Sequence, residues 1–128
     1  MQQTQQTPRR MSRQQQDCIA ACWSCAQICN TCSDDMIGMH GGGHDQALMA
    51  RCTRLCRDCA DICALAAAWM SRGSQFMEAL CRFCADTCDA CAEVCEQHAP
   101  HHALCGPCAE ECRRCANLCR EMAGAKAA

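Results

Sequence analysis

Small and apolar residues recur along four stretches of the chain at intervals that alternate between three and four positions. In residues 81–95, CRFCADTCDACAEVC, the recurring residue is cysteine, and mostly polar residues or alanines stand between the cysteines. Residues three and four apart are neighbours on the surface of an α-helix, so this spacing predicts a single continuous helical face. Polar and charged residues take most of the other positions, which predicts an amphipathic helix with a buried stripe of thiols.

The cysteine pattern is repeated. A 12-residue unit, C-x3-C-x2-C-A-x-[I/V/L]-C, occurs four times, and three of the units gain a further cysteine in phase. The four stripes therefore contain all 19 cysteines of the chain. In chain order they are Cys18, Cys22, Cys25, Cys29 and Cys32; Cys52, Cys56, Cys59 and Cys63; Cys81, Cys84, Cys88, Cys91 and Cys95; and Cys105, Cys108, Cys112, Cys115 and Cys119.

Helix-breaking segments separate the four units, and they are GMHGGGHD, SRGS and HAPHH at residues 38–45, 71–74 and 98–102. Four helices with short connections predict an all-α fold, an antiparallel four-helix bundle with a Cys-lined core. We expect residues 14–122 to form this bundle. Residues 1–13 are predicted to be a flexible arm or a short additional N-terminal helix, and residues 123–128 a tail.

The composition supports one domain with an unusual core. A chain of 128 residues is long enough for a single compact domain. Leu, Ile, Val and Phe together make up only about a tenth of the residues, which alone would suggest disorder. The formal net charge of −2 argues against disorder, so alanine and cysteine must supply the core. Interspersed charges do not indicate nucleic-acid binding, and no stretch reaches transmembrane length.

A high cysteine content first suggests a secreted disulfide scaffold. Three features oppose that interpretation: the number of cysteines is odd, their spacing is helical, and residues 1–18 contain no apolar run that could act as an export signal. We therefore expect a cytoplasmic protein whose thiols stay reduced.

Buried cysteine can act simply as a small apolar residue, but 19 in-phase thiols exceed what a core requires and add a risk of oxidation. Soft thiolates select Cu(I), Zn(II) or iron–sulfur clusters. Zinc usually binds four ligands from isolated C-x2-C pairs, and iron–sulfur clusters have characteristic ligand runs that this sequence lacks. Cu(I) is satisfied by two or three sulfurs, and one monovalent ion per thiolate neutralises the buried charge. The sequence favours multiple Cu(I) ions.

Other functions remain open at this stage. A zinc or general soft-metal buffer similar to a metallothionein would also use many thiolates, and a copper chaperone would bind the same ion. A thiol redox protein would use C-x2-C pairs, but an enzyme usually has one distinguished pair, whereas this chain has many equivalent ones. We therefore expect no enzymatic activity.

Potential metal ligands extend the cysteine stripes at one end of the predicted bundle. In helical phase with the cysteines are Met36, Met39, Met49, His98, His101 and His102, and His40 and His44 lie in the adjoining loop. Thioether and imidazole groups suit copper, so we expect metal to enter there and call this the loading end. The opposite end is predicted to be an apolar plug, with Met11, Met70, Met77, Met122, Trp69 and Phe76.

The fourfold unit, the Cys-lined bundle and the His/Met end closely resemble the bacterial copper storage proteins, in particular the cytosolic branch that has no export signal. The resemblance covers residues 18 to about 122. It implies a four-helix bundle that holds many Cu(I) ions inside and commonly assembles as a homotetramer. It also implies that all 19 cysteines are ligands, and that His98, His101 or His102 completes sites at the open end. The second stripe departs from the repeat, because Met49 stands where a fifth cysteine would be expected.

Overall fold

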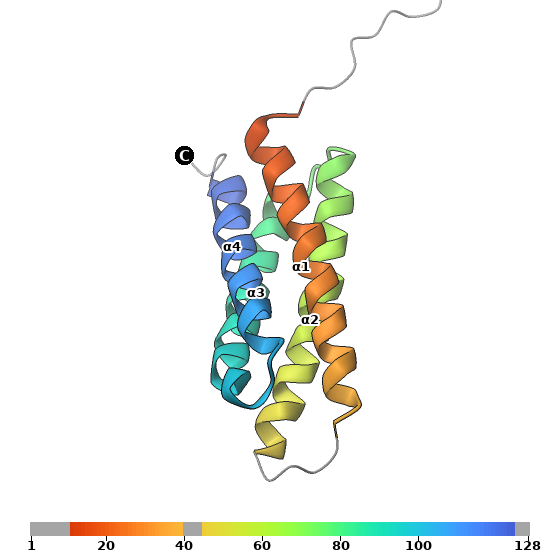
Figure 1. The fold of residues 1–128 in the computed structure, drawn as a ribbon. Coiled ribbons are helices and arrows are strands. Elements are labelled where there is room, and N and C mark those ends of the chain that lie inside the picture. Colours follow the sequence, from red (N-terminus) through yellow and green to blue (C-terminus); the bar gives the residue numbers. More distant parts are fainter. Residues whose placement is uncertain (1–10, 40–44, 125–128) are drawn as a thin grey trace, which may run out of the picture.

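The computed structural model describes residues 11–39 and 45–124, which fold into four long α-helices and one short 3-10 helix (Figure 1). The elements are α1 (Arg13–Ile37), α2 (Gln46–Ser71), α3 (Met77–His98), η1 (Ala99–His101) and α4 (Cys105–Gly124). The prediction of an all-α four-helix bundle is confirmed. Residues 1–10 of the predicted arm, residues 125–128 of the predicted tail, and His40 and His44 lie outside the described residues.

Local sequence signals set several helix boundaries. The Ser12 hydroxyl accepts a hydrogen bond of 3.0 Å from the backbone N–H of Gln15, and the Asp45 carboxylate accepts one of 3.1 Å from that of Leu48. Such caps satisfy N–H groups that have no partner inside the helix. After α2 the chain turns at Gly73, whose φ of 66° is a left-handed conformation that suits glycine. Ser12 and Asp45 therefore cap the N-termini of α1 and α2, and Gly73 takes the left-handed turn position that glycine favours.

Each helix packs against two neighbours, so that α1 contacts α2 and α4, and α3 contacts the same two helices. The chain runs up and down through the bundle, with short connections at alternating ends (Figure 1). At one end the Gln15 side chain donates a 2.8 Å hydrogen bond to the Met70 carbonyl, joining the start of α1 to the end of α2. The loading end is the opposite one, where α1 and α3 finish and α2 and α4 begin.

The core consists mainly of thiols and alanine methyl groups, as the composition predicts. Every cysteine side chain is fully buried, and the alanines that follow cysteines, such as Ala60, Ala92 and Ala116, are buried beside them. Larger aliphatic residues such as Ile28 and Leu118 are only partly buried and pack against the edges of this core. Because alanine and cysteine are small, the four helices approach closely enough for thiols of different helices to touch.

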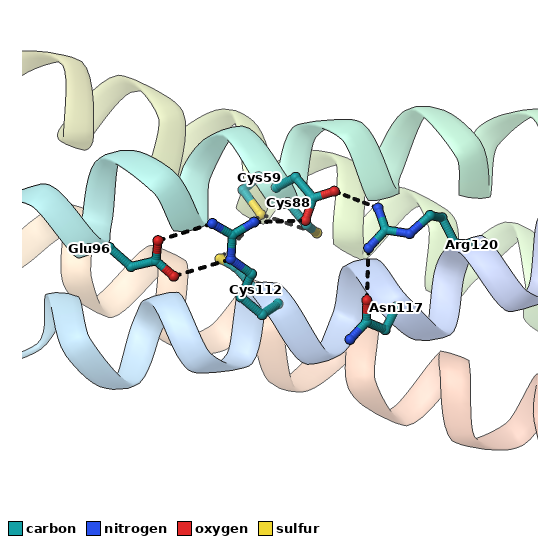
Figure 2. A network of polar contacts seen from close by, with 8 residues as sticks. Cys59, Cys88, Glu96, Cys112, Asn117 and Arg120 are labelled. Atoms are coloured by element: carbon teal, nitrogen blue, oxygen red, sulfur yellow. Dashed lines mark hydrogen bonds and ion pairs between the residues drawn. The ribbon is translucent and has the colours of Figure 1, made fainter.

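Ion pairs join α3 to α4 on the outer surface (Figure 2). The Arg113 guanidinium donates two hydrogen bonds, of 3.1 and 3.0 Å, to the carboxylate of Glu96 and a third, of 3.2 Å, to Asp89. Arg120 also pairs with Asp89 and donates to Asn117. The hydrogen bonds from Arg113 lower the pKa of Glu96. None of the helices in the described residues is long and apolar enough to span a membrane.

Candidate metal centre

The 19 cysteines form one continuous column of thiols along the bundle axis, which we call the thiol column. Contacts run along single helices, as between Cys25 and Cys29, whose Sγ atoms lie 3.9 Å apart. They also run between helices, as from Cys29 on α1 to Cys108 on α4 at 3.6 Å. All cysteines are present as free thiols with 0% exposure. The thiols predicted to share one interior are therefore brought together by the fold.

The middle of the thiol column shows how three helices converge. The Sγ of Cys59 on α2 lies 3.5 Å from that of Cys88 on α3 and 3.9 Å from that of Cys112 on α4. Figure 2 shows these three side chains together in the interior, behind the surface ion pairs. Sulfur atoms from different helices therefore point toward common positions.

Several sets of four sulfur atoms lie within 4.8 Å of one another, close enough to hold a metal ion. Neighbouring sets share members: Cys25 and Cys112, for example, each belong to at least two sets. A shared thiolate can bridge two ions, so the sets form a connected series of sites. Among them are Cys22, Cys84, Cys115 and Cys119; Cys25, Cys29, Cys59 and Cys112; Cys25, Cys63, Cys88 and Cys115; Cys29, Cys91, Cys108 and Cys112; and Cys56, Cys91, Cys95 and Cys108.

Hydrogen bonds between thiols move the pKa values of neighbouring cysteines in opposite directions. The bond with Cys112 lowers the pKa of Cys25, whereas the pKa of Cys29 is raised, first of all by its bond with Cys108. At the loading end, the bond with Cys105 lowers the pKa of Cys32 to about 5. The hydrogen bonds between thiols therefore couple the ionisation of each cysteine to that of its neighbours. A thiol that loses its proton becomes a thiolate, the form of cysteine that binds metal ions.

Two histidines adjoin the thiol column at the loading end. His98 is fully buried, and its Nδ1 lies 3.4 Å from the Sγ of Cys105. The Nδ1 of His102 lies 3.2 Å from the same sulfur and 3.7 Å from the Sγ of Cys32. Imidazole nitrogen and thiol sulfur are thus placed at one position, where both can contact a soft metal ion.

The 3-10 helix η1 decides which histidines face inward. Pro100 lies within η1, directly after the end of α3, and the chain leaves the α-helical path there. His98, the last residue of α3, is buried, and after the turn His102 is buried while His101 is exposed, with its ring centroid 6.1 Å from that of His98. The structure therefore brings two of the three predicted histidines to the thiols and leaves the third at the surface.

The methionines divide between the two ends, as the sequence pattern indicates. At the loading end Met36 is buried, with 1% exposure, and Met49 is partly buried. The Met36 sulfur accepts a hydrogen bond from the Thr53 hydroxyl at 3.8 Å. At the opposite end Met70 and Met122 are buried in the core. Both ends of the thiol column are therefore lined by thioether groups, and among residues 11–39 and 45–124 the imidazole groups lie at the loading end.

Residues 11–124 match the sequence model of one protein family, whose description is copper storage protein. This chain belongs to the copper storage protein family. Among solved structures, the Cu(I)-bound copper storage protein BsCsp3 has a TM-score of 0.77 and 40% identity, covering 87% of this chain and 99% of the other. A cytosolic copper storage protein from Streptomyces lividans, with five coppers, has a TM-score of 0.76 and 33% identity, covering 87% and 92%.

A relative is also found among curated sequences. The uncharacterized cysteine-rich protein YhjQ of Bacillus subtilis (strain 168) is 41% identical over 92 residues, which make up 72% of this chain and 82% of the relative. The resemblance inferred from the cysteine repeat is therefore confirmed at the level of the copper storage protein family.

One residue beside the thiol column of this copper storage protein was not among those that the sequence indicated. Oδ2 of Asp35 lies 2.6 Å from Nε2 of His102. Asp35 follows Cys32 by three positions, so a search for polar residues in phase with the stripe could have found it. Its histidine partner could not have been named, because that depends on where the fold places His102, the residue after η1, relative to the end of α1.

Proposed function

We propose that this protein stores and sequesters many Cu(I) ions inside the bundle and so protects the cytoplasm from free copper. The observation that carries the proposal is the series of overlapping four-sulfur sets formed by fully buried cysteines. In this role all 19 cysteines act as ligands. Storage needs many similar sites, and the thiol column supplies many equivalent thiols rather than one distinguished reactive pair, so we propose no catalysis.

Charge balance supports a monovalent cargo. Copper binds thiolate rather than thiol, so each ion that enters displaces a proton. One Cu(I) per thiolate leaves the buried core neutral, whereas one divalent ion per thiolate would bury a large positive charge at high cost. Bridging thiolates then allow uptake on the order of one copper per cysteine.

Zinc is the second candidate, and a specific observation favours it. Four sulfurs within 4.8 Å of one another are also the donor set of a tetrahedral zinc site. A zinc or general soft-metal buffer would fill separate sets of four, and shared cysteines such as Cys25 would limit the number of ions. Thiol redox chemistry would instead consume the free thiols in disulfides.

At the loading end, we propose that His98, His101 and His102, with Met36 and Met49, serve uptake. The thiol contacts of His98 and His102 support direct binding by these two rings. His101 is exposed, which suits first capture of copper rather than storage. Copper passes from imidazole and thioether groups, which need lose no proton at neutral pH, to the stronger thiolates inside.

We also propose a homo-oligomer, a tetramer by resemblance, and exchange of copper with a copper chaperone. An apolar groove between α2 and α3 supports self-association, because it is lined by Leu55, Ile62, Leu80 and the exposed side chains of Leu65 and Phe83. Exposed apolar surface of this kind marks interaction sites. Sedimentation equilibrium would test self-association, and a protein that stays monomeric at all concentrations would contradict it.

Competitive titration tests the storage proposal. Reduced, metal-free protein is titrated with Cu(I) and, separately, with Zn(II), each against a chelator of known affinity. We expect uptake of Cu(I) on the order of one ion per cysteine, with zinc displaced by Cu(I). Saturation at a few ions per chain, or retention of zinc in the presence of Cu(I), would contradict the proposal.

A further inference from the structure

Helix α1 holds the ring of His102 from two sides. The Nδ1 of His102 lies 3.7 Å from the Sγ of Cys32, and the Nε2 lies 2.6 Å from Oδ2 of Asp35. Cys32 and Asp35 are three positions apart and therefore project from neighbouring places on the same helix. The ring of His102 is buried, with only 7% exposure, so it has little room to turn away from these contacts.

The contact with Asp35 decides which ring nitrogen of His102 carries the proton. A carboxylate only accepts hydrogen bonds, so the hydrogen between the two groups belongs to Nε2. In a neutral imidazole the other nitrogen, Nδ1, then carries a free lone pair. That lone pair faces the Sγ of Cys105 at 3.2 Å. The ring is thus presented to the thiol column as a donor to a cation.

We propose that Asp35 is a positioning residue that fixes His102 in the Nε2–H tautomer and so presents Nδ1 as a Cu(I) donor beside Cys105 and Cys32. The inference rests on the proposed function, because it gives the ring a part in copper uptake. Asp35 touches no thiol itself in this role and acts through the imidazole. Its side chain is 58% exposed, so the pair also connects the buried ring to the protein surface. Loss of such a carboxylate partner typically weakens metal binding or activity by about 10–100-fold.

The first test reads the tautomer directly in metal-free protein. Nitrogen NMR of 15N-histidine-labelled, reduced apo-protein at neutral pH distinguishes a protonated ring nitrogen from an unprotonated one. We expect the Nε2–H tautomer for His102 in the wild type, and a mixture of tautomers in Asp35→Asn and Asp35→Ala. The matched control is Asp34→Asn, which removes the same charge from the neighbouring exposed position. An Nδ1–H or doubly protonated His102 in the wild type, or a pattern unaffected by either Asp35 variant, would overturn the proposal.

The second test measures uptake from a Cu(I)–bicinchoninate complex by stopped-flow absorbance. Asp35→Asn is expected to slow the fast phase by about 10-fold, and Asp35→Glu to restore part of the rate. Asp34→Asn should match the wild type. In a His102→Ala background, Asp35→Asn should have no further effect, because the ring through which it acts is gone. An equal slowing in that background would assign Asp35 a general structural role.

The two proposals fail in different ways. If the wild type binds only a few Cu(I) ions, the storage function itself is wrong. If the wild type fills to the order of one copper per cysteine while Asp35→Asn and Asp34→Asn load at the same rate, only the positioning role of Asp35 is wrong. Far-UV circular dichroism of every variant confirms that the bundle is intact.

Discussion

The Sγ atoms of Cys59 and Cys112 lie 3.9 Å apart, although they belong to α2 and α4, which face each other diagonally across the bundle. In a bundle with a leucine core, larger side chains would fill the space between diagonal helices. Here two thiols suffice to span it. The interior is therefore narrow and lined by sulfur on all sides, and any ion on the axis has thiols from several helices within reach.

Because the thiols are so numerous and so similar, single cysteines should matter little for capacity. Replacing Cys59 with Ala is expected to lower the free energy of unfolding of the apo-protein by about 1 kcal/mol and to remove only one or two copper ions at saturation. Cys59→Ser should cost about 1–3 kcal/mol, since its hydroxyl is buried among weakly hydrogen-bonding thiols. Urea unfolding and Cu(I) titration provide the measurements. Ala20→Ser, at an exposed position of α1, is the control, and a collapse of capacity in Cys59→Ala would contradict the prediction.

The apo-protein should fold before metal arrives. Alanine, aliphatic residues at the edges and the thiols themselves form a core without copper, unlike the core of a classical zinc finger. Far-UV circular dichroism of reduced, metal-free protein is expected to show a helical spectrum, and copper should raise the melting temperature because it binds the folded state. A random-coil spectrum would refute this.

Histidines at the loading end should control the rate of loading more than capacity. The double variant His98→Ala/His102→Ala is expected to load and release Cu(I) more slowly, and to lose at most the few sites nearest that end, because most thiols lie deeper. His101→Ala, at the exposed position, should have a smaller effect. Stopped-flow transfer from a Cu(I) chelator measures the rates. If loading slows only when Met70, Met77 and Met122 are changed, copper enters at the opposite end.

The ion pairs of Arg113 should give a small, pH-dependent stabilisation. Arg113→Ala is expected to lower the free energy of unfolding by less than about 1 kcal/mol, because the side chains of Arg113 and Glu96 are 44% and 50% exposed. Arg113 lowers the pKa of Glu96 in the folded protein below its ordinary value of 4.5. The stabilisation is therefore complete at pH values above 4.5, the ordinary pKa. It is lost as the pH falls through the lower pKa that Glu96 has in the folded protein.

Urea unfolding from neutral to acidic pH checks this sign. The difference between wild type and Arg113→Ala should shrink as the pH falls below about 4. Arg114→Ala is the control, since Arg114 approaches Glu111 only to 3.8 Å within the same helix. If the difference in unfolding free energy between wild type and Arg113→Ala instead grows toward acidic pH, a group other than Glu96 controls it.

The sequence by itself determined the helices, the face that each buries and the chemistry of that face. Intervals of three and four residues leave one side of a helix available for cysteine, so the positions of residues such as Cys25 and Cys29 follow from helix geometry alone. The family and the preference for soft metal follow from the same repeat. The ends of the bundle were also predictable in outline, because Met36 and His98 continue the stripes in phase.

Only the tertiary structure decided which groups meet at the loading end. The 3-10 turn at Pro100 buries His102 and exposes His101, and the sequence left these two rings equivalent. Asp35 gains its role only because the end of α1 lies beside His102, a residue 67 positions further along the chain. The buried face of a helix follows from the spacing of residues within that helix alone, so the sequence of one segment is enough to predict it. The pairing of Asp35 with His102 depends on how packed helices and turns are placed against one another, which the local pattern does not specify.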